Sequence, residues 1–221
     1  AHESGQAVRM MAVRPTLEAL PSRCDVIVIG AGITGAGIAL TAAQMGLDVL
    51  LVDQRDFASG TSCGSSKLVH GGLRYLQTGQ WHLTWESVRE REKLVRALPG
   101  LVLPQTFLWP IYKGARPGRT ALQLGMWVYD TIAWNFRSRW FDAAAALAME
   151  PSLRREGLQG AFRYSDARTD DTRLVLRIVD EAAAAGAIVR NYTQAVEFLR
   201  TQDRVRGVAL KDVETGATRE I

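Results

Sequence analysis

The sequence is poor in cysteine and histidine and contains no long apolar run. Its 221 residues include two cysteines, Cys24 and Cys63, and three histidines. Two cysteines exclude a disulfide framework and a cysteine-rich zinc site, and they favour a reducing compartment. No apolar stretch approaches the roughly 20 residues that a membrane-spanning helix needs. We therefore expect neither a metal site nor a transmembrane segment.

The first 22 residues also lack the features of a targeting signal. They contain no continuous apolar core, and Glu3 and Glu18 argue against a transit peptide. We expect residues 1–22 to form a disordered tail, with Met10 or Met11 as an alternative start of the chain.

The composition, with 47% apolar and 23% charged residues, is typical of a soluble globular protein with one large domain or two small ones. The net charge is +4, and the excess lies in a segment where basic and aromatic residues mix. This segment contains Lys113, Arg116, Arg119, Arg137 and Arg139, together with Trp127, Tyr129, Trp134, Phe136 and Trp140. It can bind nucleic acid, lie on an anionic membrane surface, or form a solvated face with core aromatics behind it. We expect no nucleic-acid partner, because no binding motif accompanies the charge.

Residues 24–54, CDVIVIGAGITGAGIALTAAQMGLDVLLVDQ, predict a βαβ unit. The apolar run 26–29 is typical of a strand buried on both faces of a parallel sheet, and a second strand, 49–52, ends at Asp53. The glycines of the connecting turn are Gly30, Gly32 and Gly35. The first permits the turn, the second lets the backbone approach a pyrophosphate, and the third lets the helix pack closely on the strand. With Asp53 placed to bind ribose hydroxyls, this unit can hold FAD or NAD.

The run GTSCGSSKLVHGGLRYL, residues 60–76, has an unusual composition. It contains four glycines and four Ser or Thr residues with one Lys, one His and one Arg. A flexible linker is also rich in Gly and Ser, but linkers rarely interleave apolar residues such as Leu68, Val69 and Leu73 with single charged groups. We interpret the run as a segment that lies along a flavin, which favours FAD over NAD.

Hydrophobic periodicity outlines the rest of the chain. A helix is predicted through about residue 98, where Pro99-Gly100 ends it, with residues 90–93 on its solvated face. Further predicted elements are an extended segment at 102–112, a helix near 121–133, a helix from 169–171 to Gly186 and a strand near 187–191. A meander is predicted after them, with segments at 195–199 and 205–213 and a third strand after Thr215-Gly216.

Together these segments resemble FAD-dependent glycerol-3-phosphate dehydrogenase, a family of D-amino-acid-oxidase-like flavoproteins. The resemblance runs from about Cys24 to the end, and it is most specific in SSKLVHGGLRYL, residues 65–76, and next in YSDARTDDTRLVL, residues 164–176. It implies an α/β fold, with a Rossmann-like FAD-binding domain, built from a central parallel sheet with an antiparallel meander, and part of an inserted substrate or cap region. The implied boundaries are 23–100 and 166–221 for the FAD-binding domain and 101–165 for the cap region.

The resemblance also implies roles for single residues. Besides the glycine turn and Asp53, the implied FAD contacts are Thr61, Ser62, Ser65, Ser66, Lys67, Gly71, Gly72 and Leu73, with Ala195 and Val196 near the adenine. Arg74 is implied to bind the substrate phosphate through a bidentate guanidinium, with Tyr75 beside it. His70 is the candidate general base, and the alternatives are that it caps a turn or hydrogen-bonds the flavin. Ala195 and Val196 also fit an ordinary hairpin strand.

The implied reaction is the oxidation of sn-glycerol 3-phosphate to dihydroxyacetone phosphate, with hydride transfer to FAD and electrons passed to a quinone. Alternatives are an oxygen-dependent glycerophosphate oxidase, another FAD-dependent amine or hydroxy-acid oxidase, or a nucleotide-binding fragment without turnover. The resemblance implies a cytoplasmic protein peripheral to the inner face of the cell membrane. Because the family continues beyond the point that corresponds to Ile221, we expect a truncated chain that is inactive alone and holds FAD weakly or not at all.

Overall fold

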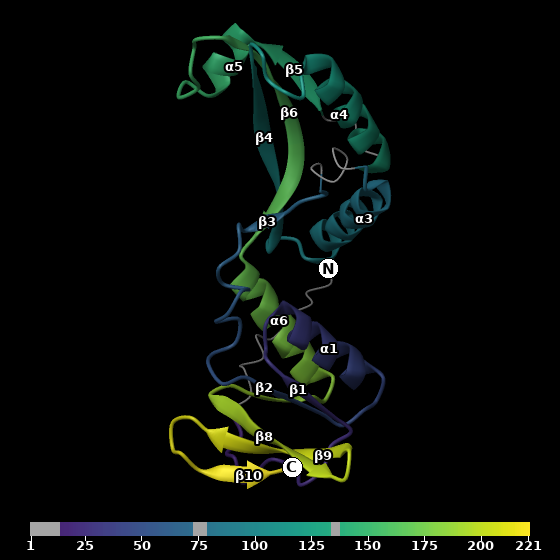
Figure 1. The fold of residues 1–221 in the computed structure, drawn as a ribbon, viewed down its shortest axis with the longest axis vertical. Helices are drawn as coiled ribbons and strands as arrows, with labels where there is room; N and C mark the ends of the chain where they lie inside the picture. Colours follow the sequence, from purple (N-terminus) through teal and green to yellow (C-terminus); the bar gives the residue numbers. More distant parts are fainter. Residues whose placement is uncertain (1–13, 73–78, 134–137) are drawn as a thin grey trace, which may run out of the picture. The chain divides into compact units, whose positions relative to one another are not determined.

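The computed structural model describes residues 14–72, 79–133 and 138–221 (Figure 1). The chain divides into two compact units. Unit 1 runs to Ser65 and resumes from Asp171 to Ile221, and unit 2 comprises residues 66–170. Both units contain helices and strands, so the class is α/β, as predicted.

A parallel sheet of three strands forms the centre of unit 1. Its strands are β1 (Val26–Ile29), β2 (Val49–Val52) and β7 (Ile188–Arg190), in the order β1-β2-β7. The side chains of β2 alternate between two cores. Val49 and Leu51 pack on one face, and Leu50 and Val52 pack on the other. Because both faces are covered, the strand is apolar at every position.

Two helices, α1 (Ile33–Gln44) and α6 (Asp171–Ala184), cover the first face of this sheet (Figure 1). The residues that they bury together are Ala36, Ala39, Ala42 and Ala43 of α1 and Val175, Val179 and Ala182 of α6. Alanine side chains are small, so the two helices approach each other and the sheet closely. The predicted βαβ unit is therefore confirmed.

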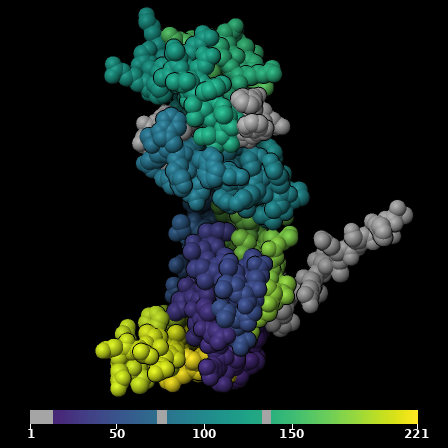
Figure 2. All heavy atoms as spheres, turned by 90° about the vertical axis from the view of Figure 1, so that its right-hand side faces the viewer, coloured from purple at the N-terminus to yellow at the C-terminus, as the bar shows by residue number. Residues whose placement is uncertain are grey.

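An antiparallel meander covers the second face. Its strands are β8 (Thr193–Thr201), β9 (Arg204–Asp212) and β10 (Thr218–Glu220), in the order β10-β9-β8. Val208 and Leu210 of β9 share a core with Leu50 and Val52. Figure 2 shows the meander, in yellow tones, against the N-terminal part of unit 1, in purple. Helices, parallel sheet and meander thus form three layers, and the predicted parallel sheet and antiparallel meander are both present.

The structure differs from the predicted disordered tail at residues 14–22. Leu17 and Leu20 are each 3% exposed, and they belong to the core beneath the meander. This segment is ordered because its two leucines complete that core. Residues 1–13 lie outside the described residues.

The buried carboxylate of Asp212 binds the same segment through Arg14. Asp212 accepts from Arg14 at 2.9 Å and from the buried Arg190, and its other oxygen accepts the N–H groups of Glu214 and Thr215. The Thr215 N–H is the main cause that lowers the pKa of Asp212 to about 2, with help from Glu214 and the two arginines against the opposing effect of burial. Asp212 is therefore ionised at neutral pH.

An antiparallel sheet organises unit 2. Its longest strand, β6 (Leu158–Thr169), pairs with β3 (Leu68–Val69), β4 (Val102–Tyr112) and β5 (Arg139–Asp142). The helices are α3 (Trp81–Ala97), α4 (Arg119–Ala133) and α5 (Ala143–Met149). Val88, Ile111, Met126, Tyr129 and Phe162 are the main members of the core. Unit 2 therefore has a hydrophobic core of its own.

Most predicted elements are found near their predicted positions. The segment at 102–112 is β4, the helix near 121–133 is α4, and the helix after 169–171 is α6. One expectation is wrong, because Arg91 on α3 is 4% exposed and not on a solvated face. Contacts divide the chain at residues 65 and 170, and the cap region at 101–165 stays a prediction. None of the described helices is long and apolar enough to cross a membrane.

Candidate functional site

The chain turns sharply between β1 and α1. Gly30 adopts φ +100°, which side-chain-bearing residues rarely adopt, and its N–H donates to the Val52 carbonyl at 2.8 Å. A Cβ on Gly35 would overlap the Gly30 carbonyl oxygen. Glycine is therefore required at both positions, and the first turn of α1 lies directly against the end of β1.

The N-terminus of α1 faces the loop that follows β2. Gly32 caps the helix without a side-chain hydrogen bond, and the hydroxyl of Ser62 accepts the Ile33 N–H at 3.1 Å. Thr61, the exposed neighbour of Ser62, lies on the same loop. The first N–H groups of a helix lack partners within the helix, and the helix dipole adds positive potential there. This end of α1 therefore favours an anionic group.

Asp53 stands at the carboxyl end of β2, beside the glycine turn. Its Oδ2 accepts the Ala31 N–H at 2.8 Å, and its Oδ1 accepts the Arg55 N–H at 2.9 Å. The Asp53 carbonyl accepts the Thr193 N–H at 2.7 Å, which fixes the main chain as well. An ionised carboxylate offers about four acceptor positions. Asp53 is thus held in place and can still accept from the hydroxyl groups of a ligand.

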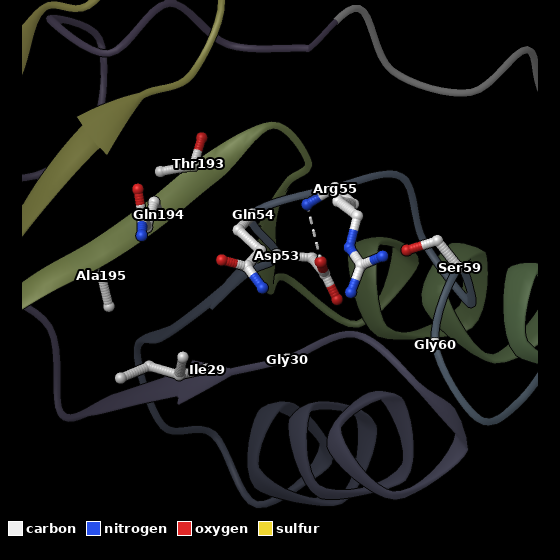
Figure 3. Close-up of a pocket in the computed structure, with 10 residues that line it drawn as sticks. All are labelled: Ile29, Gly30, Asp53, Gln54, Arg55, Ser59, Gly60, Thr193, Gln194 and Ala195. Atoms are coloured by element: carbon white, nitrogen blue, oxygen red, sulfur yellow. Dashed lines mark hydrogen bonds between the residues drawn. The ribbon is translucent and has the colours of Figure 1, made fainter.

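A pocket of about 270 Å³ lies at the carboxyl ends of the parallel strands. Its lining consists of Ile29, Gly30, Asp53, Gln54, Arg55, Ser59, Gly60, Thr193, Gln194 and Ala195. Figure 3 shows Asp53 between the Gly30 turn and the first residues of β8. Three predicted site residues, Gly30, Asp53 and Ala195, therefore meet here. Val196 is 47% exposed and is not among the lining residues.

The residues predicted near the flavin ring are distributed over both units. In unit 1, the Ser65 hydroxyl donates to Asp171 at the start of α6. In unit 2, Ser66 is exposed, and Lys67 adopts φ +60° with its Nζ 3.9 Å from Asp170 Oδ1. The Lys67 side chain is 44% exposed, so a bound anionic group can reach its ammonium.

His70 is exposed, whereas the two glycines that follow it are buried. Gly72 adopts φ +68°, and its carbonyl accepts the Thr84 hydroxyl at 3.4 Å. Leu73, Arg74 and Tyr75, which were predicted to contact flavin and substrate, lie outside the described residues.

Gly71 belongs to a buried polar cluster, which we call the Gly71 network and define by Gly71, Arg91, Tyr129 and Asp166. The Gly71 N–H donates to Asp166 Oδ1 at 3.0 Å and to the Tyr129 hydroxyl at 3.1 Å. The Tyr129 hydroxyl donates to Asp166 at 2.9 Å. Arg91 donates to the Tyr129 hydroxyl at 2.7 Å and to Asp166 at 2.6 Å. Burial, with the Asp166 carboxylate, raises the pKa of Tyr129, so its phenol stays protonated.

Residues 25–221 match the family described as FAD dependent oxidoreductase. The chain belongs to this family. FAD is the cofactor of the family, which agrees with the choice of FAD over NAD that residues 60–76 predict.

Two curated relatives with a more specific name are similar to most of this chain. It is 40% identical over 201 residues to the aerobic glycerol-3-phosphate dehydrogenase of Staphylococcus haemolyticus (strain JCSC1435), with 89% of this chain and 36% of the relative covered. It is 44% identical over 201 residues to glycerol-3-phosphate dehydrogenase 2 of Mycobacterium bovis (strain ATCC BAA-935 / AF2122/97), with 89% and 34% covered. The chain thus spans about one third of the length of these curated relatives.

A solved structure supports the same relationship. The glycerol-3-phosphate dehydrogenase from Bacillus halodurans complexed with FAD superposes with a TM-score of 0.69 at 36% identity. The superposition covers 90% of this chain and 32% of that structure. The predicted fold, a parallel sheet with an antiparallel meander in an FAD-binding protein, is therefore confirmed.

The pocket at the carboxyl ends of the parallel strands also contains residues that were not predicted from the sequence. These are Ile29, Gln54, Arg55, Ser59, Gly60, Thr193 and Gln194. The rule that ligands bind at the carboxyl ends of parallel strands could have found four of them, because they directly follow β2 and β7. Nothing in the local pattern indicates that the loop with Ser59 and Gly60 returns to the pocket.

The groups present fit the adenosine and pyrophosphate part of FAD. The pocket offers a carboxylate, Asp53, for ribose hydroxyls and the cation of Arg55. The adjacent start of α1 offers N–H donors for a pyrophosphate. A Cβ at Gly30 would meet no atom within 4 Å, so the main chain at the turn is open to close approach.

Proposed function

We propose that this chain is the FAD-binding part of a glycerol-3-phosphate dehydrogenase. The reaction is the oxidation of sn-glycerol 3-phosphate to dihydroxyacetone phosphate, with the electrons passed to a quinone. The observation that carries the proposal is the 40–44% identity to glycerol-3-phosphate dehydrogenases over 201 residues. Because only about a tenth of the chain is left unmatched, the matched part includes far more than the nucleotide-binding unit.

In this proposal the pocket of unit 1 holds the adenosine end of FAD. Asp53 accepts from the ribose hydroxyls, and its carboxylate disfavours a 2′-phosphate. The start of α1, between Gly32 and Gly35, donates N–H groups to the pyrophosphate. Ala195 lines the pocket where the adenine would lie, Ser62 contacts the start of α1, and Thr61 precedes Ser62 on the same loop.

The run 65–75 is assigned to the flavin and the substrate. Bound FAD supplies the acceptor for the hydride that leaves C2 of the substrate. His70 takes the proton of the C2 hydroxyl, so the hydride from carbon and the proton from oxygen, two electrons and two protons in total, are both accounted for. Arg74 and Tyr75 bind the phosphate, and the ammonium of Lys67 favours negative charge at the flavin. Residues 101–165 are assigned to the substrate or cap region.

The exposed basic and aromatic residues of the segment 113–140 are proposed to face the membrane in which a quinone is dissolved. They are Lys113, Arg116, Arg119, Trp127 and Arg139. Trp127 is 61% exposed, and the Arg119 guanidinium lies 4.4 Å from the centre of the Trp140 ring. Exposed aromatic and basic side chains together suit an anionic lipid surface. We accordingly place the protein in the cytoplasm, at the inner face of the cell membrane.

A chimera tests the proposed substrate. Residues 24–221 would replace the corresponding third of the Staphylococcus haemolyticus dehydrogenase, and dye reduction would be assayed with sn-glycerol 3-phosphate. We expect activity that depends on this substrate, and we expect Arg74→Ala to lower kcat/KM by roughly ten- to a hundredfold, since a charged hydrogen-bonding partner is lost.

Lys113→Ala in the same chimera is the matched control. It also removes one cation, but the cation lies outside the run 65–75 assigned to the flavin and the substrate, so kcat/KM for dye reduction should stay unchanged. A chimera that binds FAD but reduces dye with D-amino acids, and not with glycerol 3-phosphate, would contradict the proposed substrate.

A further inference from the structure

The Gly71 network places charged groups in the core of unit 2. Arg91 is 4% exposed and Asp166 is 8% exposed, and their side chains approach to 2.6 Å. Removing such a pair from water costs free energy that the attraction between the charges often fails to recover. Apolar residues of similar volume could fill the same space, so stability alone does not account for the pair.

Two of the side chains bind one main-chain group, and the third holds those two in place. The Gly71 N–H donates to both Asp166 and Tyr129, and Arg91 donates to both of those acceptors. The carbonyl of the next residue, Gly72, accepts a long hydrogen bond of 3.4 Å from the buried hydroxyl of Thr84, which also reaches the Gln80 carbonyl. The polar groups therefore fix the position of the main chain where the His70 side chain is attached.

Only glycine fits at the point of convergence. A Cβ on residue 71 would overlap the Tyr129 hydroxyl and lie 2.5 Å from Val88 Cγ2. The glycine thus makes room for side chains of the protein itself. Its N–H is engaged inside the protein, so any contact of Gly71 with a flavin would have to use other atoms.

We propose that Arg91, Tyr129 and Asp166 are positioning residues that anchor the main chain at Gly71 and thereby set the direction of the adjoining His70 side chain. The inference rests on the proposed function, which places His70 at the reacting carbon of the substrate. Tyr129 acts as both acceptor and donor between the two charged groups. Asp166 receives three donors on one oxygen, from Gly71, Arg91 and Tyr129.

Amide hydrogen exchange of the 221-residue chain, read residue by residue, tests the anchor. Tyr129→Phe removes the hydroxyl and keeps the ring, and Asp166→Asn removes the charge and keeps the shape. We expect the Gly71 amide to exchange roughly five- to tenfold faster in Tyr129→Phe, which corresponds to one lost hydrogen bond. We expect faster exchange in Asp166→Asn as well, because an amide oxygen is a weaker acceptor than a carboxylate oxygen. Amides in β4 and in the middle of α4 should keep their rates.

Tyr164→Phe is the matched control, because Tyr164 stacks on Phe107 in the same unit and its hydroxyl makes none of the hydrogen bonds that define the Gly71 network. Unchanged exchange at Gly71 in both variants would overturn the anchor. Equal acceleration at all amides of unit 2 would overturn it as well, because it would show a general loss of stability. If Asp166→Asn fails to fold, the exchange rate of the Gly71 amide in Tyr129→Phe alone decides whether the anchor exists.

The direction of His70 is read separately, from the chemical shifts of its imidazole ring. We expect these shifts to change in Tyr129→Phe and to stay unchanged in Tyr164→Phe. Unchanged shifts in Tyr129→Phe would overturn the positioning role. Failure of the chimera to reduce dye with sn-glycerol 3-phosphate would count against the proposed function, and the exchange and shift measurements would still decide the inference.

Discussion

Two glycine-containing turns of this protein use glycine for opposite purposes. At the turn after β1, Gly30 and Gly35 bring the main chain and a helix terminus to the edge of a pocket, where polar groups remain able to bind a ligand. At Gly71, the missing side chain makes room for Tyr129 and Val88, and the main-chain N–H is used within the core. A glycine-rich run therefore does not by itself mark a surface that touches a cofactor.

The carboxylates beside the two turns show the same difference. Asp53 is held by two N–H donors and lines the pocket. Asp166 is buried between Arg91, Tyr129 and Gly71, and its acceptor oxygen is saturated. The first carboxylate is suited to binding, and the second is suited to holding the protein in one conformation.

The largest expected effect concerns Gly35. In Gly35→Ala the new methyl group would overlap the Gly30 carbonyl oxygen, a main-chain atom that cannot move without opening the turn. We expect a loss of about 3 kcal/mol or more in the free energy of unfolding. Gly37→Ala on the same helix is the control, since a Cβ there meets nothing within 4 Å. Urea denaturation checks both, and equal stability of the two variants would contradict the described turn.

Gly71→Ala is the counterpart in unit 2. Here the overlapping atoms belong to side chains, Tyr129 and Val88, which can shift partly, so we expect a smaller loss of about 2–3 kcal/mol. Gly125→Ala on α4 should be neutral or slightly stabilising, because its Cβ would have open space. If Gly71→Ala were as stable as Gly125→Ala, the comparison between the two turns would break down.

Sequence reasoning predicted the parts of this fold that depend on local pattern. The apolar run of β2 and the spacing of Gly30, Gly32 and Gly35 each carry a short-range signal, and so does the position of Asp53 at a strand end. These features determined the βαβ unit and the location of the pocket. The cofactor followed from the run at 60–76 and the family resemblance.

The remaining features depend on contacts between distant residues. Arg91 stands in a charged stretch of α3, and nothing near it in sequence indicates that Asp166, 75 residues away, will bury it. Leu17 and Leu20 lie in a polar N-terminal segment, but the meander some 190 residues later provides a core for them. Such pairings are set by tertiary packing and leave no local pattern.

The dependence of stability on pH extends the comparison, because unit 1 also contains a buried carboxylate, Asp212. The pKa of Asp212 is lowered to about 2, below the unfolded value of 3.8. The stabilisation is therefore complete above the unfolded pKa and is lost as the pH falls through about 4 towards 2. We expect up to about 2 kcal/mol from this group.

Asp212→Asn should remove this part of the acid dependence, whereas Asp180→Asn on the exposed face of α6 should keep it. Thermal unfolding between pH 5 and pH 2.5 measures the difference. If the unfolding temperatures of the parent and of Asp212→Asn fall in parallel as the pH is lowered, Asp212 does not contribute to the acid dependence of stability.

The central claim is that the pocket at Asp53 binds the adenosine end of FAD, and calorimetric titration with ADP tests it most directly. ADP contains the adenosine and pyrophosphate without the flavin, so the measurement isolates unit 1. We expect the parent chain to bind ADP and Asp53→Asn to bind it about tenfold more weakly, because an amide keeps only one acceptor oxygen for the ribose hydroxyls. Asp180→Asn, with the same change of charge, should bind like the parent. Equal ADP affinity in the parent and a folded Asp53→Asn chain would contradict the account.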